Sequence, residues 1–145
     1  MPLRSVARSV TGPRRSQNED AVLADEAGGW HLLVVADGMG GHRAGDVASE
    51  AARDAFAEAV GSGLTDGTDP SGALVTGVAA AHDHLLDLVR ENPGWEGMGT
   101  TLVAALVREE SAWIVNVGDS RAYHYAGNDL EQVTVDHTVV QELVE

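Results

Sequence analysis

The sequence predicts an α+β fold, because strand-like segments gather towards the two ends of the chain and two helical segments lie between them. A doubly wound parallel sheet would instead show strands and helices in regular alternation. The chain has 145 residues, 43% of them hydrophobic, which is enough for one ordinary core and too little for two. We therefore expect one domain, with no internal repeat and no clear domain boundary.

The first part of the chain is typical of three strands. Residues 3–11 and 20–25 are expected to be short strands, separated by the turn-rich segment 12–18. Residues 30–36 form a continuous apolar run, which predicts a buried strand that is apolar on both faces. The run ends at Asp37, whose charge is costly at the mouth of a buried strand unless something compensates it.

Two amphipathic helices are predicted next. In residues 44–60, apolar side chains recur with the i, i+3, i+4, i+7 spacing, and Gly61 stands where a helix-ending glycine belongs. The segment 61–72 is rich in Gly, Ser, Thr and Asp, which predicts a loop. At its end Asp69 is the expected N-cap of a second helix that begins with proline. Asn92, which precedes another proline, ends that helix.

The last part of the chain is expected to return to strands. Three runs at 101–107, 112–117 and 121–125 are β-rich, and a fourth follows at 130–135. Turn-like segments at 108–111 and 127–129 predict that the strands they join are antiparallel neighbours. The final residues, 139–145, have the pattern of a helix that begins without reaching an end.

Composition excludes several classes of protein. The formal net charge of −14 argues against binding to a nucleic acid backbone and suits hard divalent cations such as Mg²⁺ or Mn²⁺. The absence of cysteine removes disulfides, zinc–thiolate sites and cysteine nucleophiles. The N-terminus has no apolar signal-peptide core, and no segment approaches the ~20 apolar residues of a membrane span. We therefore expect a cytoplasmic protein with no membrane segment.

Four short clusters of residues could carry chemistry. They are RSQNED at 15–20, DGMGG at 37–41, GMGTT at 97–101 and VGDSR at 117–121, and three of the four place a carboxylate at a strand end. Mg²⁺ and Mn²⁺ prefer oxygen ligands and keep several waters, so a few rigidly held carboxylates suffice, and glycine lets a backbone carbonyl come close. Taken alone, however, an Asp–Gly pair is more often only a turn.

A strand followed by a glycine loop and a helix is also the layout of a dinucleotide-binding site. Here Arg43 occupies the place of the third glycine, and no Gly-Lys-Ser/Thr sequence follows. Asp37 would also set a negative charge against the phosphates. The sequence therefore disfavours a nucleotide-binding module.

Together and in this order, the four clusters resemble the metal-dependent protein serine/threonine phosphatases of type 2C, the PPM class, in their bacterial form. The resemblance extends from about residue 5 to the last residue. It implies a four-layer αββα fold, in which an antiparallel β-sandwich is flanked by helices. Because the family's domain is longer, residues 1–145 are expected to be the N-terminal part of a single PPM-type domain, incomplete at the C-terminus.

The resemblance also implies roles for six residues. Arg15 matches the arginine that holds the substrate phosphate, and Asp37 matches the aspartate that bridges two metal ions, so these two are the expected catalytic residues. The remaining residues are associated with the metals: Glu19 at the second metal, Asp20 in support of that network, Gly38 through its backbone carbonyl, and Asp119 at a third, more loosely held metal.

The chemistry that follows from the resemblance is hydrolysis without a covalent phosphoenzyme. Two Mn²⁺ or Mg²⁺ ions share a bridging water, lower its pKa and position it for in-line attack on phosphorus, and a third ion binds more loosely. The expected partners are phosphorylated proteins, substrates of bacterial serine/threonine kinases, and the expected state is a monomer.

Two further metal-ligand aspartates of the family have no match, because Asp129 and Asp136 lie in a different context. With Asp37 as the one carboxylate ligand of the first metal, affinity at that position should fall sharply. Two hypotheses stay open. The favoured one is a fragment of a longer phosphatase, and the alternative is a truncated, non-catalytic interaction or sensor module that keeps the first half of the fold.

Overall fold

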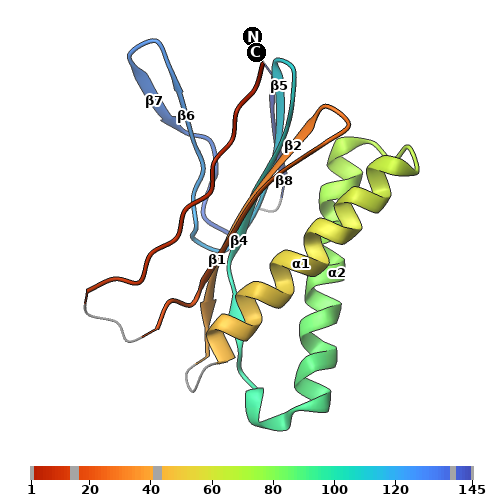
Figure 1. The fold of residues 1–145 in the computed structure, drawn as a ribbon, viewed down its shortest axis with the longest axis vertical. Helices are drawn as coiled ribbons and strands as arrows, with labels where there is room; N and C mark the ends of the chain where they lie inside the picture. The colour runs from red at the N-terminus through yellow and green to blue at the C-terminus, as the bar shows by residue number, and fades with distance from the viewer. Residues whose placement is uncertain (1, 14–16, 41–43, 138–139, 145) are drawn as a thin grey trace.

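The computed structural model describes residues 2–13, 17–40, 44–137 and 140–144. One face of its main sheet is covered by two long helices, and a separate hairpin and the N-terminal segment lie on the opposite side (Figure 1). The elements in chain order are β1 (Asp20–Ala27), β2 (Trp30–Met39), α1 (Ala44–Thr65), α2 (Pro70–Glu91), the 3₁₀-helix η1 (Pro93–Trp95), β3 (Gly99–Thr100), β4 (Leu102–Arg108), β5 (Ser111–Val117), β6 (Tyr123–Ala126), β7 (Asp129–Gln132) and β8 (Val140–Val144).

The main sheet has the strand order β1-β2-β4-β5-β8, with the short strand β3 pairing at the end of β2. All of its pairs are antiparallel, and β6 pairs with β7 in the separate hairpin. The predicted α+β class is confirmed. Of the four layers that the resemblance implies, the described residues form one helical layer and one main sheet.

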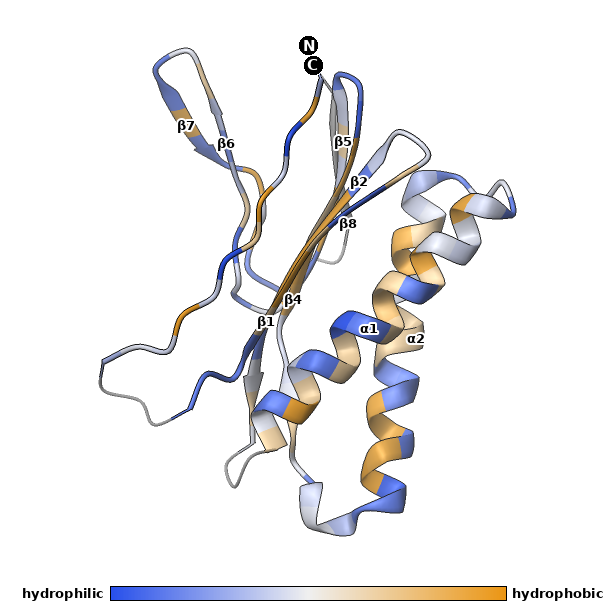
Figure 2. Ribbon diagram, in the orientation of Figure 1, coloured by the Kyte–Doolittle hydropathy of each residue, from blue (hydrophilic) through white to orange (hydrophobic). Residues whose placement is uncertain are grey.

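The principal core lies between this sheet and the two helices. Val34 on β2 and Leu106 on β4 are fully buried and belong to one cluster with Phe56 of α1 and Leu74 of α2. Figure 2 shows the central strands coloured mostly as hydrophobic. Because side chains alternate along a strand, every second residue of β2 and β4 points away from this core.

The opposite face of the sheet, here called the open face, is also apolar. Val103 and Ile114 lie beneath Val133 in a second, smaller cluster, while Val35 remains 44% exposed. A groove of about 440 Å³ runs along this face. The sequence therefore correctly predicted that the strand after residue 30 is apolar on both faces, but only one of those faces is fully covered.

The prediction of a strand at residues 3–11 is wrong. Residues 2–12 follow the open face in Figure 1 but form no strand, because a strand requires a neighbour with which to share a ladder of hydrogen bonds. One side-chain contact on this segment joins Ser5 Oγ to Nδ1 of the buried His31, at 3.2 Å. The other early strand begins where it was expected, at Asp20, and extends to Ala27.

The expected end of the first helix at Gly61 is also wrong, since α1 continues to Thr65. The role of the helix-ending glycine belongs to Gly67, which has a φ of 86°. The amides of Gly67 and the next residue donate to the carbonyls of Leu64 and Gly63, at 3.2 and 2.8 Å respectively. This pair of bonds is a Schellman motif, so the loop starts later than the sequence suggested.

The second helix begins and ends as predicted. Asp69 is its N-cap, and its Oδ2 accepts a hydrogen bond from the Gly72 amide at 3.1 Å. Pro70 is the first helical residue and Asn92 the C-cap. Within the described ranges, no helix is both long enough and apolar enough to span a bilayer.

The C-terminal residues do not form the expected helix. Residues 140–144 are strand β8, which pairs with the edge of β5 from Val140↔Val115 to Val144↔Ser111, while residues 139 and 145 lie outside the described part. The edge of β5 would otherwise present a row of unpaired backbone hydrogen-bonding groups. Pairing with this edge makes the segment a strand, although its local sequence pattern is helical.

The two helices approach each other closely at Gly77 of α2. A Cβ atom placed there would lie 2.8 Å from atoms of both Phe56 and Val60, whereas one at Gly61 of α1 would meet nothing within 4 Å. We expect Gly77→Val to lower the free energy of unfolding by about 1–3 kcal/mol through overpacking. Gly61→Val serves as the matched control and should change it by less than about 0.5 kcal/mol. Urea denaturation of both variants measures the difference, and equal effects would contradict this packing.

Candidate active site

The described residues of the four clusters meet at the end of the sheet where β1 begins and β2 ends. Asp37 and Gly38 do not form a turn, because β2 continues to Met39. Asp37 pairs with Asp20 of β1, and Gly38 pairs with Thr100 of β3. Pairing on both sides keeps the backbone extended beyond the apolar run, and it joins the first three clusters directly.

Asp20 and Asp37 face each other across the two strands. Residues directly opposite in an antiparallel pair project from the same face, with Cβ atoms about 4.5–5.5 Å apart. Both side chains are exposed, so burial does not impose on Asp37 the cost that the sequence suggested. Two like charges in this position repel each other, and a cation between them relieves the repulsion.

The Glu19 carboxylate lies against the first turn of α1. A Cβ atom on Gly45, in the first turn of that helix, would overlap the Glu19 carboxylate. A Cβ atom on Gly38 would overlap the Gly45 carbonyl, and the Gly38 amide donates to the Glu19 carbonyl at 3.0 Å. The two glycines therefore allow the helix to approach the strand end, and they bring the half-buried Glu19 side chain to the helix N-terminus.

The buried Thr101 connects the last cluster to Asp37. The Asp37 amide donates to Thr101 Oγ1 at 3.1 Å, and the Thr101 amide donates to the Asp37 carbonyl at 3.0 Å. The Thr101 hydroxyl also makes a short hydrogen bond with the Ser120 hydroxyl, next to the exposed Asp119. The sequence drew attention to both clusters but gave neither hydroxyl a role.

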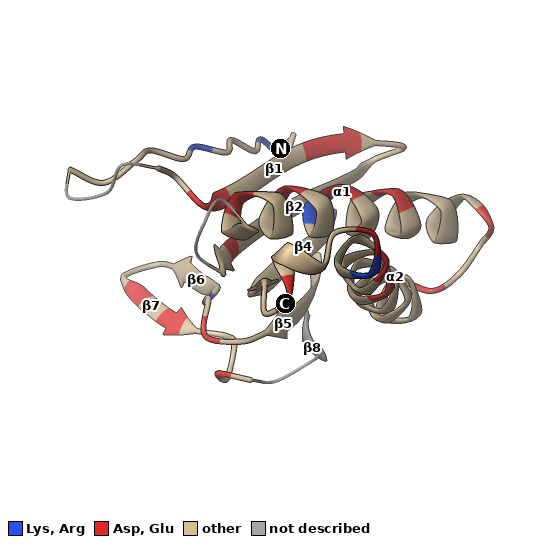
Figure 3. Ribbon diagram, turned by 90° about the horizontal axis from the view of Figure 1, so that it is seen from below, with Lys and Arg blue, Asp and Glu red and all other residues tan. Residues whose placement is uncertain are grey.

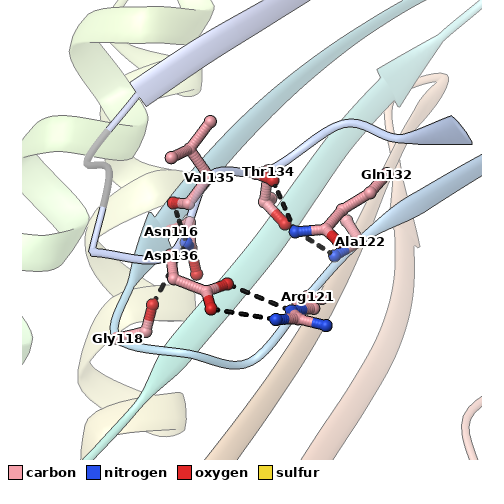
Figure 4. A network of polar contacts seen from close by, with 8 residues as sticks. All are labelled: Asn116, Gly118, Arg121, Ala122, Gln132, Thr134, Val135 and Asp136. Carbon is pink, nitrogen blue, oxygen red and sulfur yellow. Dashed lines mark hydrogen bonds and ion pairs between the residues drawn. The ribbon is translucent and has the colours of Figure 1, made fainter.

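Asp136, which matches no metal ligand of the family, has a structural partner in Arg121. Its two carboxylate oxygens accept from Nε and Nη2 of Arg121, at 3.1 and 3.0 Å (Figure 4). The Arg121 guanidinium lowers the pKa of Asp136, and the same hydrogen bonds raise the pKa of Arg121. Asp129 lies apart from this cluster, on the β6–β7 hairpin.

The roles of all six predicted site residues stay predictions, and Arg15 lies outside the described part of the chain. Figure 3 looks at the end of the sheet where β1 begins, with acidic residues at β1 and on both long helices. Basic residues are few and all are arginines, as the chain contains no lysine.

The site residues offer the type of ligand that a divalent cation prefers, but too few of them lie together. Asp20, Asp37 and Asp119 offer the carboxylate oxygens that Mg²⁺ and Mn²⁺ prefer. Within the residues that the structure describes, however, no group of three or more acidic or histidine side chains is arranged to hold a metal ion. The described residues alone therefore do not form a metal site, and the metal roles of these carboxylates stay predictions.

An α+β fold with carboxylates at adjoining strand ends agrees with the family that the motifs resemble. Residues 13–142 match the Protein phosphatase 2C family, and the chain belongs to this family.

Relatives and solved structures of the same kind are similar over most of the chain. The serine/threonine protein phosphatase PstP of Mycobacterium tuberculosis is 42% identical over 147 residues, which cover 99% of this chain and 27% of that protein. The serine/threonine phosphatase stp of Listeria welshimeri is 38% identical over 142 residues, 94% of this chain and 56% of that protein. The chain thus spans about half or less of these relatives.

A crystal structure of the PstP catalytic domain in complex with two manganese ions superposes with a TM-score of 0.77 at 39% identity, covering 89% of this chain and 54% of that one. A structure of the Mycobacterium tuberculosis PstP/Ppp phosphatase gives the same TM-score at 40% identity, covering 89% of this chain and 52% of that one. The fold is therefore that of the bacterial PPM phosphatases.

The contribution of the Thr101 hydroxyl can be tested separately from that of the side chain's volume. Thr101→Val keeps the volume but removes the acceptor of the Asp37 amide, and the residue is buried, so we expect the free energy of unfolding to fall by about 1–3 kcal/mol. Thr101→Ser retains the hydroxyl and should restore the protection of the Asp37 amide. Amide exchange followed by NMR measures both variants. Unchanged protection of the Asp37 amide in Thr101→Val would contradict this hydrogen bond.

Proposed function

We propose that this chain contributes to the metal-dependent hydrolysis of phosphoserine and phosphothreonine in proteins. The observation that carries the proposal is the register of β1 and β2, which sets the Asp20 and Asp37 carboxylates opposite each other at the strand ends. Membership of the Protein phosphatase 2C family and similarity to a manganese-bound relative support it.

Each site residue has a part in this proposal. Asp37 would bridge two Mn²⁺ or Mg²⁺ ions, Gly38 would add its carbonyl, and Glu19 and Asp20 would hold the second ion and its waters. Asp119 would bind a third ion. When bound, the ions supply a water of lowered pKa positioned for in-line attack on phosphorus.

Arg15 would bind the phosphoryl group. A guanidinium can donate two parallel hydrogen bonds to phosphate oxygens, which orients the group and offsets the charge that develops during attack. In the sequence Arg15 stands four residues before Glu19, whose carbonyl accepts a hydrogen bond from the Gly38 amide of β2 at 3.0 Å. Phosphorylated proteins, modified by bacterial serine/threonine kinases, would be the substrates, and the cytoplasm the place of action.

A second candidate is a non-catalytic interaction or sensor module. It is favoured by the incomplete donor set within the described residues. The two candidates differ in a single measurable property, which is turnover of a phosphopeptide in the presence of metal.

The test is hydrolysis of a phosphothreonine peptide by the full chain with and without Mn²⁺. We expect metal-dependent release of phosphate, and a loss of about 100-fold or more in Asp37→Ala, because a direct metal ligand matters at least as much as its supporting residues. Asp129→Ala is the matched control, since Asp129 is an equally exposed aspartate on the separate hairpin.

Circular dichroism establishes that each variant is folded. A folded wild-type chain that is inert both with and without Mn²⁺ would overturn the catalytic proposal and favour the sensor module. Equal losses in the Asp37 and Asp129 variants would contradict the assigned site.

A further inference from the structure

The loop that carries Asp119 is fixed on both sides. On one side, Gly118 has a φ of 101°, and a Cβ atom there would lie 2.9 Å from the Thr101 methyl group. On the other side, the amide of His137 donates to the Gly118 carbonyl at 2.7 Å. The loop therefore lies between two segments. One is Thr101, the residue before β4, and the other is residues 133–137, which follow the β6–β7 hairpin.

A buried amide side chain links the same two segments. Asn116 at the end of β5 is only 2% exposed, and its Nδ2 donates to the Val135 carbonyl at 2.9 Å. The same nitrogen lies 3.4 Å from the Gly118 carbonyl. Because this bond is buried, it holds residues 133–137 against β5 from within the fold (Figure 4).

The outer connection is the paired hydrogen bond between Arg121 and Asp136, here called the clasp. Figure 4 shows the guanidinium and the carboxylate facing each other across the loop. A second tie lies beside it, in which the amide of Ala122 donates to the Thr134 hydroxyl at 3.2 Å. A two-bond fork fixes orientation as well as distance, which a single ion-pair contact does not.

The effect of the clasp extends to Asp37. Ser120 lies between Asp119 and Arg121, and its hydroxyl binds Thr101, which accepts from the Asp37 amide. The clasp therefore holds the Asp119 loop against Thr101, the residue that also binds the end of β2 at Asp37. Without it, the loop beyond Ser120 is held by the backbone contacts of Ala122 with residues 133 and 134.

We propose that Arg121 and Asp136 are positioning residues, which hold Asp119 and Ser120 in a fixed relation to Asp37. Neither residue needs to touch substrate or metal to do this. The part of the inference that concerns metal binding rests on the proposed function, in which Asp119 holds a third ion. The part that concerns the loop rests on the geometry alone.

The experiment compares Arg121→Gln, Asp136→Asn and the exchanged pair Arg121→Asp/Asp136→Arg in the full chain. The exposed Arg90–Asp87 pair on α2, joined by one bond of 3.2 Å, supplies the matched controls Arg90→Gln and Asp87→Asn. Two readouts are used: hydrogen exchange of residues 116–122 by mass spectrometry, and Mn²⁺ binding by electron paramagnetic resonance.

We expect each single clasp variant to speed exchange in 116–122 by about five- to tenfold and to weaken the loosest Mn²⁺ site by a similar factor, as suits a partly exposed forked pair. The exchanged pair should recover at least half of both losses. The α2 controls should change neither readout, although they remove an ion pair as well.

Unchanged exchange in both single clasp variants would overturn the proposal. So would losses that the exchanged pair does not recover, because they would then arise from the individual side chains and not from their pairing. A wild-type chain that binds no Mn²⁺ would contradict the proposed function, and hydrogen exchange alone would then decide whether the clasp positions the loop.

Discussion

The register of β2 is the constraint on which both the core and the site depend. This strand pairs with β1 from Asp20↔Asp37 to Ala27↔Trp30 and with β4 from His31↔Val107 to Val35↔Val103. A slip of one residue would turn every side chain of the strand to the other face. Val34 would then leave the helical core, and Asp37 would turn towards the helices. The burial that stabilises the fold thus also decides where the Asp37 carboxylate points.

Local sequence patterns predicted the elements that depend on local interactions. The second helix could be delimited from Asp69 to Asn92 because its caps are neighbours in sequence. The patterns failed where a distant partner decides. Residues 139–145 looked helical, but an open edge of β5 is available for pairing, and residues 3–11 looked like a strand but have no ladder in the described structure. Gly61 could not be distinguished from the true helix-ending Gly67 without knowing which glycine adopts a positive φ.

The site shows the same division. The acidic residues could be found because each stands in a short motif with a resemblance to a known family. Their connections could not be found, since Thr101 lies 64 residues from Asp37, and Asp136 lies 15 residues from Arg121. A hydroxyl acceptor or an ion pair at such separations leaves no periodic signal in the sequence. The roles of the six site residues are still predictions, and Arg15 lies outside the described ranges.

The acidic residues are held by two kinds of support, and under the proposed function this difference would make their metal affinities unequal. Asp20 and Asp37 stand on the continuous backbone ladder between β1 and β2. Asp119 stands on a loop. The outer support of this loop is the Arg121–Asp136 pair, whose side chains are 46% and 33% exposed respectively. Local opening of such a loop costs less free energy than opening a central strand, so part of any binding energy at Asp119 is spent on ordering the loop. Under the proposed function, the ion at Asp119 would therefore be held more loosely than the ions at Asp20 and Asp37.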